Sequence, residues 1–346
     1  MKSLRLYGPN DIRLDEVPLP SITEDELLLK TDAAAICGTD VRMWQNGYKG
    51  VNADHPLVLG HEFAATVVQV GANVPFYQKG MQVAMAPNIG CGICNKCVRG
   101  DFHLCNDYRA FGINMDGAFA EYIRVPKEAL THGNLMILPK GVSPEEAAVN
   151  EPLSCVYNGF LKCDVRPGDH VLIVGSGPIG IMHAQLAKMA GAAKVMMNDL
   201  SEERLAESAA IVKGMLTYRG DDLPGFVFGQ TGGRGLDVAV VACPSPEVQA
   251  AMLPLMEYGG RVIFFGGVPA GKQPVAIDTN IIHYKELFIT GSTRANICHF
   301  RKTLEFIASG LVDVKSLVTA RFKIENILTA FDFARQAKGL KNVILF

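Results

Sequence analysis

The pattern of apolar and polar residues changes near residue 145. Before that point the chain contains short apolar stretches separated by glycine and proline, with examples at 67–71, 81–85 and 117–126. Short strands at this spacing predict a β-rich, barrel-like module. Ser143 then precedes Pro144 and two glutamates, a pattern typical of a capped helix start. We therefore expect the first module to end close to this helix.

From about residue 168, apolar strands alternate with helical segments. Segment 170–174 is a nearly continuous apolar run, as expected for a parallel strand buried on both faces. Helices are predicted over 178–190 and from about 201. The predicted strands are 170–174, 194–198, 236–241, 261–265 and 287–290. This alternation predicts an α/β fold with a doubly wound parallel sheet.

The last fifty residues contain two further helical patterns and a terminal strand. The helices are expected near 299–308 and 324–337, and the strand over 342–346. We expect this tail to return to the first module. The predicted domains are 1–147, a nucleotide-binding domain over 148–292, and a C-terminal segment over 293–346.

Composition narrows the function classes. The 346 residues include 33 Lys+Arg against 35 Asp+Glu, a formal net charge of −2, which argues against a nucleic-acid binder. No apolar run reaches the roughly 18 residues of a membrane span, and the N-terminus lacks a signal-peptide pattern. We expect a cytoplasmic protein without a membrane partner. Nine cysteines without an export signal favour metal binding or free thiols over disulfides.

A glycine-rich loop follows the strand at 170–174. Gly175, Gly177 and Gly180 form a G-x-G-x-x-G pattern between a buried strand and a helix, as in dinucleotide-binding loops. Pro178 and Ile179 open the helix whose N-terminus would face the pyrophosphate.

An acidic residue ends the next predicted strand. Asp199 would accept hydrogen bonds from the adenosine ribose and repel a 2′-phosphate, so NAD is favoured over NADP. Arg204 could reach a 2′-phosphate and weaken this preference, but we expect it near the adenine or in solvent. Gly266 and Gly267 follow a later strand, where their backbone could lie against the nicotinamide.

Four cysteines crowd into fifteen residues. Cys91, Cys94, Cys97 and Cys105 have the spacing of a closed tetrahedral zinc site, which is structural because no coordination position stays open. An iron–sulfur cluster, free thiols or a nucleic-acid-binding zinc ribbon are the alternatives.

A second set of metal-ligating residues is dispersed along the chain. Cys37, His61, Glu62 and Glu151 are the residue types of an open catalytic zinc site. Spacing alone does not unite them. Cys37 could be a small buried residue, His61 a hydrogen-bonded loop histidine, and the two glutamates surface acids.

These motifs together resemble the zinc-dependent medium-chain alcohol dehydrogenase family. C-G-T-D at 37–40, G-H-E-F at 60–63, the four-cysteine lobe, E-P-L-S at 151–154 and the glycine loop occur in the family's order. The resemblance covers essentially the whole chain. It implies a GroES-like β-barrel catalytic domain, a Rossmann domain, a cleft between them, two zinc ions per chain, NAD, and a homodimer or homotetramer.

Within this family the chain resembles the polyol dehydrogenase branch, which includes sorbitol and galactitol-phosphate-like enzymes. Glu151 stands where other alcohol dehydrogenases have a second cysteine ligand. The resemblance makes Glu62 a further candidate ligand, and Cys155 is a rival for the third position. A carboxylate in place of a thiolate suits a substrate that binds through two hydroxyls.

The resemblance implies reversible hydride transfer from a secondary alcohol. Thr39 would pass on the alcohol proton, with Glu62 or Glu151 as alternative acceptors, although Thr39 could instead cap a helix. Trp44 and Arg294 are candidate substrate contacts. Arg42, Lys49, Arg109 and Arg294 could together hold a sugar phosphate.

Two alternatives stay open at this point. One is an amino-alcohol dehydrogenase of the threonine type, which shares the C-G-T-D and G-H-E motifs. The other is a non-enzymatic, zinc-stabilised binding scaffold, which would need only the four-cysteine ion.

Overall fold

The computed structural model describes residues 1–269 and 271–346 and divides into two compact units. Unit 1 comprises Met1–Ser154, Ala295–Gly310 and Val314–Phe346, and unit 2 comprises Cys155–Arg294 with Leu311–Asp313. Most of the C-terminal tail thus belongs to unit 1. The domain boundaries after residues 147 and 292 stay predictions.

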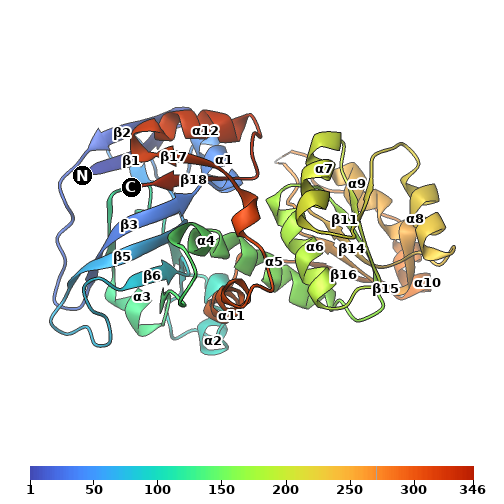
Figure 1. Cartoon of the computed structure of the whole chain (residues 1–346), viewed down its shortest axis with the longest axis horizontal. Coiled ribbons are helices and arrows are strands. Elements are labelled where there is room, and N and C mark those ends of the chain that lie inside the picture. The colour runs from blue at the N-terminus through green and yellow to red at the C-terminus, as the bar shows by residue number, and fades with distance from the viewer. Residues whose placement is uncertain (270) are drawn as a thin grey trace. The chain divides into compact units, whose positions relative to one another are not determined.

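Unit 1 is built on a seven-stranded sheet in the order β10-β6-β5-β3-β18-β17, with β9 also paired to β3 (Figure 1). A three-stranded sheet, β2-β1-β4, and the pair β7-β8 accompany it. The strands are β1 (Lys2–Gly8), β2 (Asp11–Glu16), β3 (Leu27–Ala35), β4 (Leu57–Val58), β5 (Glu62–Val70), β6 (Gln82–Met85), β7 (Asn88–Ile89), β8 (Arg109–Ala110), β9 (Tyr122–Val125), β10 (Leu135–Ile137), β17 (Val318–Lys323) and β18 (Lys341–Leu345).

Helices of unit 1 are short and connect the strands. The predicted cap at Ser143 is confirmed: its hydroxyl accepts from the Glu146 N–H at 3.3 Å, and the Glu146 carboxylate accepts from the Ser143 N–H at 3.0 Å. α5 runs on into unit 2. The helices are α1 (Gly38–Asn46), α2 (Asn95–Val98), η1 (Phe102–Leu104), α3 (Lys127–Thr131), α4 (Pro144–Ala148), α5 (Asn150–Cys163), α11 (Ile297–Ala308), η3 (Lys315–Leu317), η4 (Ile324–Asn326) and α12 (Ile327–Arg335).

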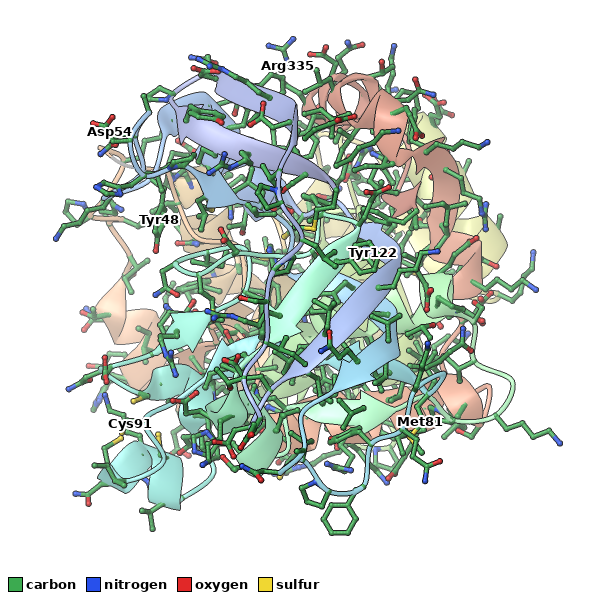
Figure 2. All side chains as sticks on the ribbon, turned by 90° about the vertical axis from the view of Figure 1, so that its left-hand side faces the viewer. Tyr48, Asp54, Met81, Cys91, Tyr122 and Arg335 are labelled. Atoms are coloured by element: carbon green, nitrogen blue, oxygen red, sulfur yellow. The ribbon has the colours of Figure 1, made fainter. Side chains whose placement is uncertain are left out.

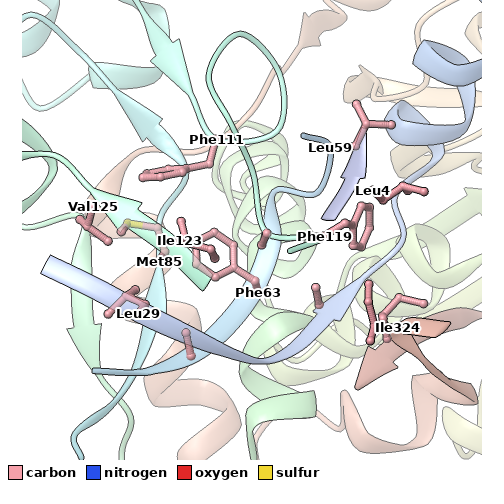
Figure 3. Close-up of a cluster of buried hydrophobic side chains, with 14 of the residues drawn as sticks. Leu4, Leu29, Leu59, Phe63, Met85, Phe111, Phe119, Ile123, Val125 and Ile324 are labelled. Atoms are coloured by element: carbon pink, nitrogen blue, oxygen red, sulfur yellow. The ribbon is translucent and has the colours of Figure 1, made fainter. Parts of the chain in front are cut away.

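Buried aromatic rings form the centre of the core of unit 1 (Figure 3). Phe63 packs edge-on against Phe111 at 5.9 Å between ring centroids, and Phe119 packs edge-on against Phe331 at 5.5 Å. A Cβ on Gly60 would lie only 2.9 Å from the backbone nitrogen of Phe119. Glycine is therefore required just before His61, and the core packing sets the position of the candidate site.

Unit 2 contains a six-stranded, all-parallel sheet in the order β13-β12-β11-β14-β15-β16. Numbered within the unit this order is 3-2-1-4-5-6, the Rossmann arrangement, which confirms the predicted fold. The strands are β11 (His170–Val174), β12 (Lys194–Asn198), β13 (Leu216–Tyr218), β14 (Leu236–Val241), β15 (Met256–Phe264) and β16 (Phe288–Gly291). The helices are α6 (Pro178–Met189), α7 (Glu202–Ile211), α8 (Leu223–Thr231), α9 (Pro246–Ala251), η2 (Leu253–Leu255) and α10 (Thr279–Lys285).

Some predicted element bounds need correction. Only Tyr122–Val125 of the stretch 117–126 is a regular strand, because Gly117 and Ala118 instead pack against Gly60. The helix predicted over 324–337 is a 3₁₀ turn followed by α12, which ends at Arg335. The terminal strand begins at Lys341, one residue earlier than predicted, and this difference matters for the site below. No helix in the described ranges has the length and apolarity needed to cross a membrane.

Candidate metal and cofactor sites

Three neighbouring strands of unit 1 bring distant residues to one end of the sheet. β3 pairs antiparallel with β5, with Ala35 opposite Glu62, and with β18, with Ala35 opposite Val343. Cys37 follows the end of β3, and Glu62 and Lys341 are the first residues of their strands. Strand pairing therefore places these three side chains close together.

Cys37, His61 and Glu62 form a cluster whose ligand atoms all lie within 4.8 Å of one another. Cys37 is the N-cap of α1, and its sulfur accepts from the Thr39 N–H at 3.4 Å. Asp40 completes the turn, because its carboxylate accepts from the backbone N–H of Cys37 at 2.9 Å. Helix capping thus fixes the thiol beside the other two ligands.

The chemistry of this cluster fits a zinc ion. Nδ1 of His61 lies 3.5 Å from the Asp40 carboxylate, which leaves Nε2 for an ion. Oε1 of the fully buried Glu62 has no hydrogen-bond partner among the described residues. Burial alone would lower the pKa of His61, but Asp40 and Cys37 raise it well above its usual value. A thiolate, an imidazole and a carboxylate oxygen are an accepted zinc ligand set.

A buried lysine lies behind the cluster. The Nζ of Lys341, a residue only 4% exposed, donates to Oε2 of Glu62 in a short ion pair and to the Ile36 carbonyl at 3.2 Å. Burial works to lower the pKa of Lys341, but Glu62 and the Cys37 sulfur raise it above its usual value. The ion pair with Glu62 therefore favours the charged form of this buried lysine.

Lys341 and Asp40 are not among the site residues predicted from the sequence. Asp40 had a local signal, since an acid three residues after an N-cap completes a capping box. Lys341 had a weaker one, a charged residue at the start of a strand whose last three residues are apolar.

Glu151 and Cys155 lie outside the close cluster. Glu151 is the second residue of α5 and 7% exposed, and its charge contributes to the raised pKa of Lys341. The charge of Glu151 therefore acts on Lys341. Direct ligation of a metal by Glu151 stays a prediction. Cys155, the rival ligand, also falls outside the three-residue group.

Thr39 does not cap the helix, because Cys37 occupies that position. Its hydroxyl instead accepts a 2.8 Å hydrogen bond from the guanidinium of Arg42 one turn later. Trp44 packs against Phe331 with ring centroids 6.0 Å apart, and Arg335 lies over its ring. Its assignment as a substrate contact stays a prediction, and the observed contacts are those of a residue packed against the core.

The four cysteines form a separate cluster at the edge of unit 1, around Cys91 (Figure 2). Sγ atoms lie 4.0 Å apart between Cys91 and Cys97 and 3.8 Å apart between Cys94 and Cys105. Four sulfurs each about 2.3 Å from one zinc at tetrahedral angles lie about 3.8 Å from one another. Backbone N–H donation, chiefly from Cys97, lowers the pKa of Cys94 to about 6, which favours the thiolate that a metal needs.

The glycine loop of unit 2 has the expected geometry. Gly175 has φ +112°, and Gly177 is the N-cap of α6. A Cβ on Gly180 would lie 1.9 Å from the Gly175 carbonyl oxygen, so only glycine permits this packing of helix on strand. Pro178 and Ile179 form the first turn of α6, whose N-terminus is suited to binding a pyrophosphate.

Asp199 is tied to the same loop. Its carboxylate accepts from the backbone N–H groups of Ser176 at 2.7 Å and Ser201 at 2.9 Å. Burial works to raise the pKa of Asp199, but these donors and Arg204 lower it below its usual value. The guanidinium of Arg204 lies beside the loop, 3.5 Å from where a Cβ on Gly177 would be.

The remaining predicted residues follow β15 and β16. A Cβ on Gly266 would lie 2.5 Å from the Cys243 carbonyl oxygen, so the close approach at Gly266 is to the chain itself. Around Gly267 there is open space. Arg294 has φ +56°, and its carbonyl accepts from the Asn158 amide at 2.9 Å. Contacts of Gly267 with nicotinamide and of Arg294 with substrate stay predictions.

Comparisons with known proteins agree with this geometry. Residues 23–135 match the alcohol dehydrogenase GroES-like domain, and residues 178–309 match the zinc-binding dehydrogenase domain. The chain is 32% identical to sorbitol dehydrogenase of Bacillus subtilis over 343 residues, covering 98% of this chain and 95% of that protein. It is 33% identical to L-threonine 3-dehydrogenase of Chelativorans sp., covering 99% and 98%.

A solved structure extends the similarity to the whole fold. A protein from Sinorhizobium meliloti 1021, described as a zinc-binding dehydrogenase and bound to NADP, superimposes with a TM-score of 0.91 at 29% identity, covering 100% of this chain and 99% of that one. Family match, relatives and fold agree across both units. The chain therefore belongs to the zinc-dependent medium-chain alcohol dehydrogenase family and is a dehydrogenase.

Proposed function

We propose that the protein catalyses the zinc- and NAD-dependent oxidation of a secondary alcohol, in a polyol or polyol phosphate, to the ketose, reversibly. The observation that carries this proposal is the buried cluster of Cys37, His61 and Glu62. Its carboxylate oxygen makes the site harder than one with a second thiolate, which suits a substrate binding through two hydroxyls. Family membership argues against the alternative of a non-enzymatic scaffold.

Two bound groups supply the central chemistry. Zinc would act as a Lewis acid that lowers the pKa of the substrate hydroxyl, and NAD would accept the hydride. The chain itself supplies the zinc ligands, holds these side chains in position and excludes water. Cys37 is fixed by its helix cap and Glu62 by Lys341, and the Asp40 carboxylate lies 3.5 Å from Nδ1 of His61. Such fixed ligands need little rearrangement during the reaction.

Thr39 is suited to carry the proton away from the alcohol. Its oxygen accepts from Arg42 through one lone pair, so its second lone pair could accept the alcohol proton while its own hydrogen passes to the next acceptor. The guanidinium beside it favours negative charge, which helps an alcohol lose its proton. Glu62 and Glu151 remain alternative acceptors in this proposal.

A substrate panel tests the proposal. Initial rates with NAD on D-sorbitol, galactitol 1-phosphate and L-threonine should be highest for one of the first two. An L-threonine 3-dehydrogenase-like activity is the second candidate, because relatives with that name match as well as the sorbitol dehydrogenase does. Inactivity on every polyol, with turnover of L-threonine, would overturn the proposal in favour of that candidate.

We expect NAD to be preferred over NADP because Asp199 would repel a 2′-phosphate. Replacing Asp199 by asparagine keeps the size and an acceptor oxygen but removes the charge. The ratio of kcat/KM for NADP to that for NAD should then rise about 100-fold, the effect of relieving a like-charge contact. Glu207→Gln, an exposed change on α7, is the matched control and should leave the ratio as it is. An unchanged ratio in Asp199→Asn would contradict the assignment.

Three further properties are part of the proposal. We expect two zinc ions per chain, one at Cys37, His61 and Glu62, with Glu151 as the alternative carboxylate ligand, and one in the four-cysteine lobe. We expect a homodimer or homotetramer, since β16 is an edge strand and Phe288 on it is 67% exposed. Analytical ultracentrifugation would check the assembly. We also propose a cytoplasmic location, a reducing compartment in which cysteine thiolates can serve as metal ligands.

A further inference from the structure

We propose that Lys341 is a positioning residue for the catalytic metal, holding Glu62 so that one carboxylate oxygen faces the ion and the other is kept back. The inference rests on the proposed function, because it concerns how the same site keeps a coordination position open for substrate. It assigns a role to a side chain that lies outside the candidate ligands.

The two carboxylate oxygens of Glu62 have different contacts. Oε2 accepts from the Lys341 ammonium, while the buried Oε1 has no hydrogen-bond partner among the described residues and belongs to the group with Cys37 and His61. A carboxylate can bind a metal through one oxygen or through both. With Oε2 bound by Lys341, Glu62 can offer only Oε1.

Lys341 is itself held in place by the fold. Its Nζ also donates to the Ile36 carbonyl at 3.2 Å, the residue just before Cys37, and it heads β18, which pairs with β3. The ammonium therefore has a fixed position relative to the end of β3. It cannot follow Glu62 if the carboxylate turns.

Charge points the same way. The thiolate of Cys37 and the carboxylates of Asp40, Glu62 and Glu151 together carry four negative charges, and a zinc ion supplies two positive ones. Lys341 offsets one of the remaining two in a region where Asp40 and Glu62 are fully buried and Lys341 is 4% exposed. Buried charges persist in proteins when they are paired in this way.

A substitution of similar shape without charge should release Glu62. In Lys341→Met, both oxygens of Glu62 are free to bind the ion and occupy the position that substrate needs. Lys341→Arg keeps the charge and should behave like the wild type. In the double variant Lys341→Met, Glu62→Gln neither charge is present, so the position should open again.

Cobalt bound in place of zinc at Cys37, His61 and Glu62 gives a readout that does not depend on turnover. Its visible absorption reports the number of ligands, and imidazole serves as a small probe for the open position. We expect imidazole to shift the spectrum of the wild type and of Lys341→Arg at similar concentrations. Lys341→Met should need at least about tenfold more imidazole, and the double variant should return close to the wild-type value. Equal imidazole binding in Lys341→Met and wild type, with both loaded, would overturn the proposal.

Zinc retention provides the second measurement if Lys341→Met does not fold. Glu62→Gln alone leaves Lys341 unpaired beside the metal, so zinc should leave this site to a chelator faster than it leaves the double variant. Equal release rates from the two would also overturn the proposal. If the wild type takes up no metal beyond the four-cysteine ion, the proposed function fails as well. A loaded wild type without these differences sinks only the role of Lys341.

Discussion

Replacing Cys37 by serine should abolish turnover while leaving the fold intact. Cys37 is one of three clustered ligands, and it also caps α1 through its acceptance from the Thr39 N–H. Serine is a good N-cap, so the helix start is kept while the thiolate is lost. Loss of Lewis-acid stabilisation is worth several kcal/mol, so kcat/KM should fall by at least about 10³-fold. Initial rates on the best substrate of the panel measure this change.

Zinc content and a control substitution at another cysteine distinguish loss of the catalytic ion from loss of the fold. Elemental analysis should give one zinc per chain in Cys37→Ser against two in the wild type, with an unchanged circular dichroism spectrum. Cys298→Ser, an exposed cysteine on α11, should keep both ions and full activity. Cys155→Ser tests the rival ligand, because loss of the second zinc there would make Cys155 a ligand. Full activity of Cys37→Ser with one zinc would contradict a catalytic role for this ion.

The Rossmann half of the fold could be predicted because its signals are local. The strand at 170–174, the glycine loop and Asp199 follow one another within about thirty residues, and each is a short pattern with its own physical reason. The structure places β11 at His170–Val174, as predicted, and begins α6 at Pro178. A buried parallel strand shows itself as an apolar run whatever its neighbours are.

The barrel half was harder to predict because its strands are short and its sheet is held by distant pairings. Gly117 belongs to no regular strand because it packs against Gly60, a contact between residues far apart in the sequence. No residue pattern within 117–126 predicts the packing of Gly117 against Gly60. Tertiary contacts decide the local structure there, as they often do for β-rich segments.

The candidate site divides in the same way. The four-cysteine lobe is complete within fifteen residues, so its spacing alone predicted a cluster. Cys37 and Glu62 meet because β3 pairs with β5. Their spacing in the sequence did not predict a joint site, and the family resemblance did. Lys341 lies 279 residues from Glu62 in the sequence, and only the pairing of β18 with β3 reveals the contact.

Replacing Cys94 by serine should unfold the lobe formed by residues 91–105. The lobe has little apolar core of its own, since α2 has four residues and η1 three, while Ile93 is 85% and Val98 74% exposed. One ion held by four thiolates must therefore supply most of its stability. Loss of such a site costs on the order of 4–5 kcal/mol. Thermal unfolding should shift to lower temperature, and limited proteolysis should cut within 91–105.

The same variant distinguishes the two metal sites, because it should lose the structural ion first. Purified Cys94→Ser should contain one zinc per chain. The ion of the lobe is lost, and chains that stay folded keep the ion at Cys37, His61 and Glu62. Cys298→Ser again serves as the control and should resist the protease like the wild type. An iron–sulfur cluster in the lobe would reveal itself by iron and visible absorption in the wild type. A Cys94→Ser protein with two zinc ions and an intact lobe would contradict the prediction that the lobe needs all four thiolates to hold its ion.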